Sequence, residues 1–234
     1  MNNGQPKLVA IIPARGGSKR IPRKNIRDFC GIPVLSLTIQ KLKATSLFDR
    51  IIVSTDDLQV AEIAIESGAE YIERPAELAD DFTTTIDVVS SVVLELKYTE
   101  RSDVLFCCVY PISPEISFEH LSQAMNLFRE KDLDFVFAAK RFPSPIFRAL
   151  VLADDGYSKM VFPEHETNRS QDLDPTFSDA GLFYMGKKEA WVEKRPILNG
   201  KSAFIEIGKY ESIDVDDEED WIIAEELFRI RNSK

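Results

Sequence analysis

The chain has 234 residues, of which 44% are hydrophobic, and its 29 lysines and arginines face 39 aspartates and glutamates, giving a formal net charge of −10. This length is ample for one substantial core, and the negative balance excludes a general nucleic-acid-binding surface or attraction to an anionic membrane. No apolar run approaches the roughly 20 residues of a membrane span, and no leader-like pattern opens the sequence, so we expect a cytoplasmic protein.

Strand-like apolar runs alternate with segments of helical periodicity along the first 142 residues. We expect strands over 7–14, 50–57, 69–75, 103–111 and 134–142, with helices over 34–45, 58–68, 84–99 and 117–131. The run 103–111 is the most apolar, as is typical of a central parallel strand. It carries Cys107 and Cys108, which together with Cys30 show no metal-ligand spacing and are expected to be buried reduced thiols. The alternation predicts an α/β domain with a mostly parallel sheet flanked by helices.

The pattern becomes irregular, polar and rich in Pro, Asp and Phe from 143 to about 188. Regularity returns with expected strands over 202–207 and 210–217 and a last amphipathic helix over 218–231. We therefore predict one domain over 1–234 that contains 143–190 as an insertion. The insertion carries several aromatic side chains that are either exposed at an interface or packed in a small core of their own: Phe147, Phe162, Phe177 and Phe183.

A glycine-rich cationic loop follows the first strand. Gly16 and Gly17 allow backbone N–H groups to approach an anion, and five cations lie within the ten positions 15–24. In open α/β sheets ligands bind where strands end, so this loop is placed at the binding edge. Such crowded cations repel one another unless a polyanion neutralises them, which favours a triphosphate site over a solvated charge run. The loop matches neither a Walker A motif nor G-x-G-x-x-G, which disfavours a phosphate-loop kinase.

The acidic stretch "DVDDEED" at 214–220 has two interpretations from its residues alone. Asp216 could be the N-cap of the last helix, with Glu219 at the third position of a capping box. If the strand instead continues through the stretch, alternation places Asp214 and Asp216 on one face, where they could hold Mg²⁺ opposite the cationic loop.

The motif "IPARGGSKRIPRKN" at 12–25 resembles that of the CMP-sialic acid synthetase family, the cytidylyltransferases that activate nonulosonic acids. The blocks "IIVSTDD" (51–57), "ERPAELADD" (73–81) and "SIDVDDEED" (212–220) are similar to further family blocks in the same order. The resemblance covers nearly the whole chain. It implies a Rossmann-like nucleotidyltransferase fold, CTP as a substrate, and Mg²⁺ (or Mn²⁺) as the cofactor.

The resemblance also implies roles for individual residues. The nucleotide-binding set is Arg15, Gly16, Gly17, Ser18, Lys19, Asn25, Arg74 and Thr85; the catalytic set is Arg15, Lys19, Lys24, Asp214 and Asp216, with Asp214 and Asp216 as the metal ligands. Judged from the residues alone, Arg74 could equally be a solvated loop residue and Thr85 a helix N-terminal residue. The anomeric hydroxyl of the sugar would attack the α-phosphorus of CTP, and the sequence identifies no general base.

The insertion resembles that of the pseudaminic acid cytidylyltransferases within this family, through "FPEHETNRSQDL" (162–173) and "DAGLFY" (179–184). This implies pseudaminic acid as the sugar, with Tyr110, His165, Arg169, Gln171 and Tyr184 as sugar-binding residues. Leu182 and Met185 depart from the Gln and Trp usual in that group, and His165 could also be a structural imidazole. Family enzymes exchange this segment between protomers, which implies a homodimer with shared sites.

Three other readings remain. Within the family, the sugar could be sialic or legionaminic acid. Outside it, the chain could be a non-catalytic nucleotide-binding module, which the joint presence of Lys24, Asp214 and Asp216 disfavours.

Overall fold

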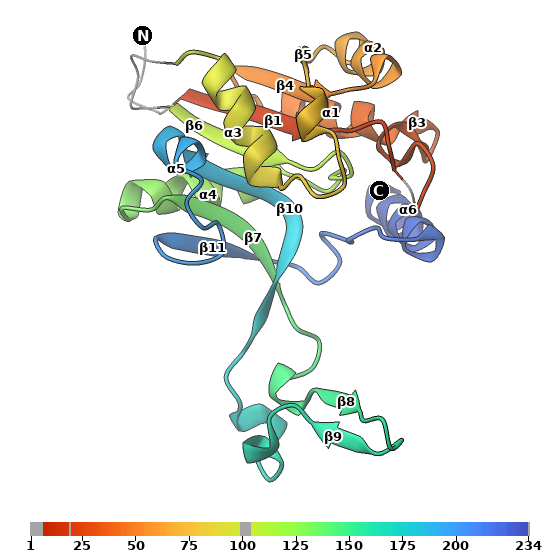
Figure 1. The fold of residues 1–234 in the computed structure, drawn as a ribbon, viewed down its shortest axis with the longest axis vertical. Coiled ribbons are helices and arrows are strands. Elements are labelled where there is room, and N and C mark those ends of the chain that lie inside the picture. Colours follow the sequence, from red (N-terminus) through yellow and green to blue (C-terminus); the bar gives the residue numbers. More distant parts are fainter. Residues whose placement is uncertain (1–6, 19, 99–103, 234) are drawn as a thin grey trace.

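The computed structural model describes residues 7–18, 20–98 and 104–233, and within them seven strands form one sheet (Figure 1). In spatial order the strands are β11 (Ser202–Ile207), β7 (Phe135–Arg141), β10 (Phe177–Lys187), β6 (Val104–Val109), β1 (Lys7–Pro13), β4 (Arg50–Thr55) and β5 (Glu70–Glu73). All neighbours pair in parallel except β10, which is antiparallel to both β6 and β7. The predicted mostly parallel α/β sheet is therefore confirmed.

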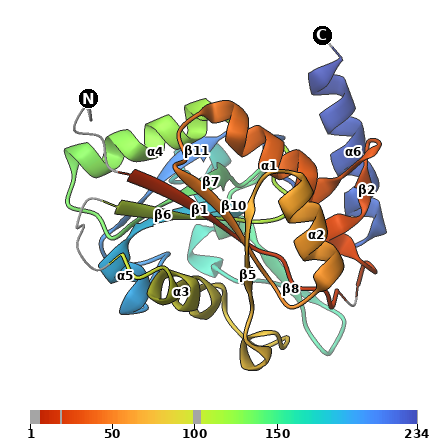
Figure 2. The same ribbon diagram turned by 90° about the horizontal axis from the view of Figure 1, so that it is seen from above.

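Helices cover both faces of the sheet, as Figure 2 shows from above. One face carries α1 (Val34–Thr45), α2 (Leu58–Glu66) and α4 (Phe118–Glu130), and the other carries α3 (Thr85–Glu95) and α5 (Lys188–Val192). Successive side chains of β1 alternate between these layers: Leu8 and Ala10 pack with the first set, and Val9 and Ile11 with the second. Because both faces are covered, β1 and β6 read as continuous apolar runs instead of alternating ones.

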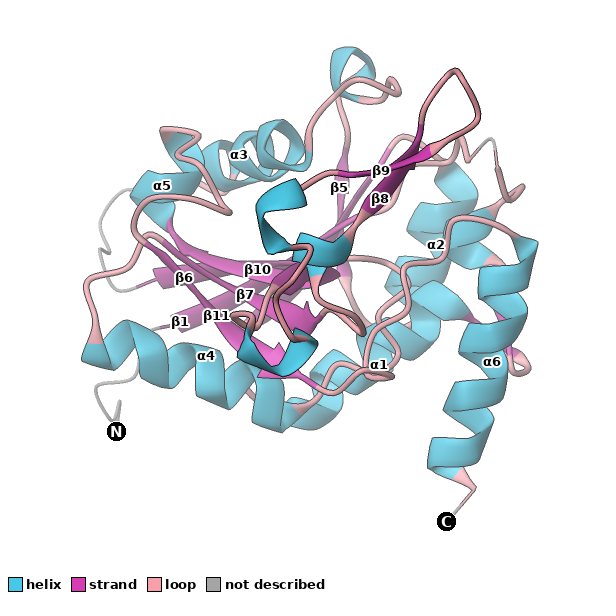
Figure 3. Ribbon diagram, turned by 90° about the horizontal axis from the view of Figure 1, so that it is seen from below, coloured by secondary structure: helices cyan, strands magenta, loops and turns pink. Residues whose placement is uncertain are grey.

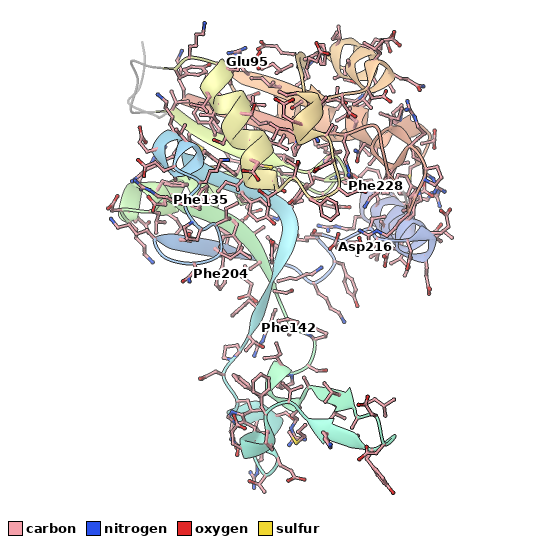
Figure 4. All side chains as sticks on the ribbon, viewed as in Figure 1. Glu95, Phe135, Phe142, Phe204, Asp216 and Phe228 are labelled. Atoms are coloured by element: carbon pink, nitrogen blue, oxygen red, sulfur yellow. The ribbon has the colours of Figure 1, made fainter. Side chains whose placement is uncertain are left out.

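A small lobe projects from this body, built from residues between β7 and β10 (Figure 1). It contains a hairpin of β8 (Leu150–Leu152) and β9 (Ser158–Met160) and the 3₁₀ turns η3 (Ile146–Arg148), η4 (Pro163–His165) and η5 (Ser170–Asp172). Figure 3 shows the lobe in front of the sheet when the molecule is viewed from below, and Figure 4 places Phe142 in the narrow connection.

The lobe is shorter than the predicted insertion, because the chain re-enters the sheet as β10 at Phe177. The expectation of irregular structure up to about 188 was therefore wrong for β10. Phe183 is fully buried in the body, and Phe177 packs on Phe204 at 4.9 Å between ring centroids. Within the lobe, Phe147 contacts Phe162 at 5.7 Å, so only these two of the four predicted aromatics form a small cluster there.

The C-terminal segment leaves β11 and crosses the binding edge of the sheet before α6 (Glu218–Asn232) begins. The expected strand over 210–217 is absent. Helix α6 packs on the small hairpin of β2 (Asp28–Phe29) and β3 (Ile32–Pro33), where Trp221 and Phe228 each meet Phe29 at 5.5 Å. This packing brings the C-terminal acids beside the cationic loop.

The N-cap of α6 is Asp217, so the prediction of Asp216 in that role was wrong. The Asp217 carboxylate accepts the N–H groups of Glu219 and Asp220, and Asp220 at the third position completes the capping box. The carboxylate of Asp216 pairs elsewhere, with Arg20.

The cysteines are free thiols; Cys107 and Cys108 on β6 are fully buried, and Cys30 is half-buried. Burial raises the pKa of both β6 thiols, which makes them unreactive. In the part of the chain that the structure describes, no helix combines the length and hydrophobicity needed to cross a bilayer.

Candidate active site

A polar pocket of about 870 Å³ opens where β1 and β6 end. Its walls come from the loop after β1, the stretch between β5 and α3, the residues after β6, the start of β10 and the segment before α6. The predicted site residues that line it are Arg15, Ser18, Lys24, Asn25, Arg74, Thr85, Tyr110, Tyr184, Asp214 and Asp216. Residues separated by up to 201 positions in the sequence thus meet at one edge of the sheet.

The cationic loop is held in shape by its neighbours. The N–H of Gly16 donates to Asp56 Oδ1 at 3.0 Å, and a Cβ at Gly16 would lie 2.6 Å from an oxygen of Asp57, so only glycine fits there. Asn25 donates from its side-chain amide to the carbonyl of Arg15 at 2.8 Å. Gly17 flanks the pocket without lining it. Lys19 lies outside the described residues.

Three loop cations have carboxylate partners within the chain itself. Arg15 pairs with Asp81 at 2.5 Å, Arg20 with Asp216 at 2.7 Å, and Arg23 with Asp57 at 2.6 Å. The mutual repulsion expected of the crowded cations is therefore relieved in part by the protein's own acids. A phosphate ligand must compete with those carboxylates for the guanidinium groups it uses.

The acidic pair points into the pocket even though its segment is not a strand. Val215 is 2% exposed and packs against Phe29 and Trp221, while Asp214 and Asp216 on either side line the pocket (Asp216 is labelled in Figure 4). The strand on which the predicted alternation depended is absent, yet both carboxylates line the pocket. This placement answers the question left open by the sequence: Asp214 and Asp216 are pocket carboxylates, and the capping role belongs to their neighbour.

Lys24 links the loop to this acidic segment. Its ammonium donates to the carbonyl oxygen of Val215. Burial lowers the pKa of Lys24, and the nearby charges of Asp214 and Asp216 oppose that shift. The ammonium thus lies between the cationic loop and the acidic pair.

The donor set in the pocket fits a hard divalent cation. Asp214 and Asp216 offer carboxylate oxygens, the ligands that Mg²⁺ prefers, and Mg²⁺ is usually held by one or two carboxylates with phosphates and water completing its shell. Among the described residues, no group of three or more Asp, Glu, His or Cys side chains is placed to hold a metal by itself. Water, or a phosphate ligand when one is bound, would supply the rest of a metal's coordination here.

Arg74 is buried, with 6% of its surface exposed, so the reading as a solvated loop residue was wrong. Its guanidinium donates to the carbonyl of Ser54 at 2.9 Å, while its Nε has no hydrogen-bond partner. Burial lowers the pKa of Arg74. Buried donors are normally satisfied, and Arg74 lines the pocket, but its Nε is itself enclosed by protein, so a ligand acceptor could meet this N–H only after a small shift of the pocket wall.

An aromatic wall closes the other side of the pocket. Thr85 is the first residue of α3, and its hydroxyl lies 2.9 Å from that of Tyr110. It therefore belongs both to the N-terminus of a helix and to the pocket wall. The rings of Tyr110 and Tyr184 meet edge to face at 5.8 Å, and Tyr184 donates to Asp179. Burial raises the pKa of Tyr110 to about 12, so its hydroxyl stays protonated at neutral pH.

Three predicted sugar-binding residues lie on the lobe and not among the described residues that line the pocket: His165, Arg169 and Gln171. His165 packs on Phe147 at 4.8 Å between ring centroids and lies 3.3 Å from the amide of Asn168, which is a structural environment. Arg169 and Gln171 are exposed. The chain therefore does not bring these three to its own pocket.

The pocket also contains four charged residues that the predicted site omitted: Arg20, Asp80, Asp81 and Asp179. Arg20 is one of the five cations within 15–24, but the sequence predicted no individual role for it. Asp80 and Asp81 end the block "ERPAELADD", and Asp179 opens "DAGLFY". All three acids therefore stand in motifs already recognised in the sequence. Only the fold shows that Asp81 pairs with Arg15 and Asp179 with Tyr184.

The comparisons with known proteins agree with this geometry. A family model described as cytidylyltransferase matches residues 9–228. The pseudaminic acid cytidylyltransferase of Campylobacter jejuni serotype O:2 is 35% identical over 97% of this chain and 98% of its own. The N-acylneuraminate cytidylyltransferase A of Danio rerio is 29% identical over 94% of this chain and 50% of its own.

Among solved structures, a CMP:2-keto-3-deoxy-manno-octonic acid synthetase complexed with CTP superposes with a TM-score of 0.69 at 15% identity. The match covers 96% of this chain and 99% of that one, which confirms the predicted nucleotidyltransferase fold. The family match over nearly the whole length, together with the 35% identical relative, also confirms the prediction of a nucleotidyltransferase enzyme. The chain belongs to the cytidylyltransferase family.

Proposed function

We propose that this protein couples CTP to a nonulosonic acid, forming the CMP-sugar and pyrophosphate, and that the acid is pseudaminic acid. The observation that carries the proposal is the single pocket in which a glycine-rich cationic loop faces a pair of carboxylates. The relative that is 35% identical over 97% of the chain carries the name of the pseudaminate enzyme, which supports this sugar over sialic and legionaminic acids.

In this reaction the sugar hydroxyl forms a new bond to the α-phosphorus of CTP, the bond to the bridging oxygen of pyrophosphate breaks, and the hydroxyl proton passes to solvent. The work of the protein is positioning and charge stabilisation. Arg15 and Lys24 would bind the departing phosphates, with the N–H of Gly17 and the hydroxyl of Ser18 beside them, while Gly16 holds the loop through its N–H bond to Asp56. We keep Lys19 in this set as a proposal. Arg74 would donate its unpaired Nε–H to the nucleotide, while Asn25 fixes the loop and Thr85 fixes Tyr110.

Asp214 and Asp216 would hold Mg²⁺ (or Mn²⁺). When bound, the cation supplies Lewis-acid stabilisation of the phosphate charge. Lys24, anchored on the carbonyl of Val215 between these carboxylates, keeps its ammonium at the edge where the triphosphate enters.

The sugar would bind against the wall of Tyr110 and Tyr184, and the lobe of a second copy would complete the site. Two observations support this arrangement. Arg169 and Gln171 are exposed on a lobe that does not reach its own pocket, and the β8 hairpin exposes apolar side chains, with Leu150, Val151 and Leu152 at 63%, 50% and 80%. Arg169 could then bind the sugar carboxylate in bidentate fashion, and His165 would position that part of the lobe.

Mixed dimers test the shared site. Lys24→Ala and Arg169→Ala should each be nearly inactive, because one damages the pocket and the other the lobe. After co-expression, mixed dimers should regain activity, since one of their two sites is then built from intact elements. No recovery in purified mixed dimers would show that each protomer uses its own lobe, and full activity of Arg169→Ala by itself would show that Arg169 has no role at the site.

The reaction itself is tested by pyrophosphate release with CTP, Mg²⁺ and pseudaminic acid, which we expect to occur where nucleoside triphosphates are made, in the cytoplasm. Turnover should vanish in excess EDTA and with hexose 1-phosphates. If CTP binds but no acid sugar gives pyrophosphate, the non-catalytic nucleotide-binding module becomes the better reading.

A further inference from the structure

Arg20, in the cationic loop after β1, forms an ion pair with a carboxylate of the pocket. Its Nη1 lies 2.7 Å from Oδ1 of Asp216, one of the two carboxylates that line the pocket opposite the loop. Both side chains are accessible, with 67% and 50% of their surfaces exposed, so a ligand can reach either group without rearrangement of the core. In the free protein, then, a guanidinium suited to phosphate and a carboxylate suited to a cation neutralise each other.

We infer that Arg20 is a positioning residue that couples nucleotide binding to cation binding through its ion pair with Asp216. A triphosphate entering the pocket would take the Arg20 guanidinium, because phosphate accepts it in the same bidentate manner as a carboxylate. Asp216 is thereby released with its charge unpaired and becomes free to bind a divalent cation. The inference rests on the proposed function for the identity of the two ligands.

The direction of the coupling follows from the shared pair. Whichever ligand binds first must break the contact between Arg20 and Asp216, and the second ligand finds it already broken. Each ligand therefore strengthens the binding of the other by the same factor, as linkage requires. Because exposed ion pairs contribute modestly, that factor is about two- to fivefold. When both ligands are bound, the cation also contacts the phosphates directly, and this contact adds a separate coupling. Binding measurements with one ligand at a time avoid that contribution.

The neighbouring Arg23 supplies a matched control. It belongs to the same loop and pairs with a carboxylate at 2.6 Å, that of Asp57, but neither residue lines the pocket. Substituting Arg23 removes the same charge without freeing a pocket carboxylate. An effect of charge alone would thus appear in both arginine variants, whereas an effect of the ion pair appears only at Arg20.

The first experiment titrates the nucleotide-free protein with Mn²⁺ and follows the free ion by electron paramagnetic resonance. Arg20→Gln should bind Mn²⁺ about two- to fivefold more tightly than wild type, Arg20→Lys should lie close to wild type because it keeps a charge for the pair, and Arg23→Gln should change the affinity by less than about twofold. Equal gains in Arg20→Gln and Arg23→Gln, or no gain in either, would overturn the inference.

The second experiment measures CTP binding by calorimetry with EDTA present. Asp216→Asn should tighten metal-free CTP binding, since Arg20 is then free to meet the phosphates, and the gain should shrink when Arg20→Gln is added. Additive effects of the two substitutions would contradict the coupling. Neither experiment depends on turnover, so a failed pyrophosphate assay with these results intact would reject the proposed reaction and leave the role of Arg20 standing.

Discussion

Replacing Arg74 by methionine should weaken CTP binding without weakening the fold. Arg74 is 6% exposed and its Nε–H has no hydrogen-bond partner, while the nearby charge of Asp56 offsets only part of the effect of burial on its pKa. A buried cation that is incompletely paired is unfavourable in the free protein. The carbonyl of Ser54, which accepts from Arg74, also accepts the N–H of Ala14 at 2.9 Å, so Arg74→Met leaves that acceptor satisfied.

The magnitude follows from the contact that would be lost. A hydrogen bond to a charged group contributes about 1.5–3 kcal/mol, which corresponds to roughly 10- to 150-fold in the Kd for CTP. The Tm of Arg74→Met should equal or exceed that of wild type, whereas a loss of 1 kcal/mol in a chain of this size would lower it by about 2–4 °C. Arg74→Lys keeps a charge but not the Nε donor and should bind CTP with intermediate affinity.

Calorimetric titration with CTP and a thermal melt of the same samples provide the two readouts. A variant that binds CTP normally but melts several degrees lower would refute the reasoning, because Arg74 would then be a structural residue. Loss of both affinity and stability in Arg74→Met, with full recovery in Arg74→Lys, would show that charge alone matters and that the unpaired Nε does not.

Three further predictions concern the acidic pair, the lobe and the N-cap of α2. Asp214→Asn and Asp216→Asn should each lower kcat by about 10²–10³ while the melting curve is unchanged, as expected for lost charge stabilisation; near-normal turnover at limiting Mg²⁺ would contradict a metal role. Leu152→Asp should weaken self-association measured by light scattering and make activity fall on dilution, and an unaltered dimer would move the interface elsewhere. Asp57→Ala should destabilise the protein by about 0.5–2 kcal/mol, because Asp57 caps α2 by accepting the N–H of Val60. The hydrogen bond from Arg23 holds the pKa of Asp57 below its usual value. The contribution of Asp57 to stability is therefore present above about pH 4 and disappears as the pH falls through that lowered pKa. If the denaturation midpoints of Asp57→Ala and wild type changed with pH in the same way, this would be ruled out.

The local sequence pattern was sufficient to predict most strands and helices of the main α/β body. The apolar runs that became β1 and β6 are bounded by turn residues and covered on both faces, and α1 spans Val34–Thr45 as predicted, so nothing in the tertiary structure overrides their preferences. The cationic loop could also be placed, because it directly follows the first strand of an α/β sheet.

Long-range contacts explain what the sequence could not provide. β10 follows a polar, irregular lobe and enters the sheet antiparallel between two strands that precede it, a position that periodicity does not encode. The N-cap of α6 is Asp217, which forms a capping box with Asp220, and the ion pair of Asp216 with Arg20, far away in the chain, is not visible in the local sequence. Burial of Arg74 depends on contacts with β4 and is likewise not visible in its neighbours.

The most direct test of the account is a competition assay in which pseudaminic and sialic acids are offered together with CTP and Mg²⁺, with both CMP-sugars quantified by mass spectrometry. Tyr110 and Tyr184 give the pocket an aromatic wall, and a site that leaves the hydroxyls of a substrate without hydrogen-bonding partners discriminates strongly against that substrate. We predict that CMP-pseudaminic acid forms with a kcat/KM at least about 10²-fold higher than that for CMP-sialic acid. Comparable amounts of the two products would contradict the sugar assignment, and the absence of any CMP-sugar would contradict the proposed reaction.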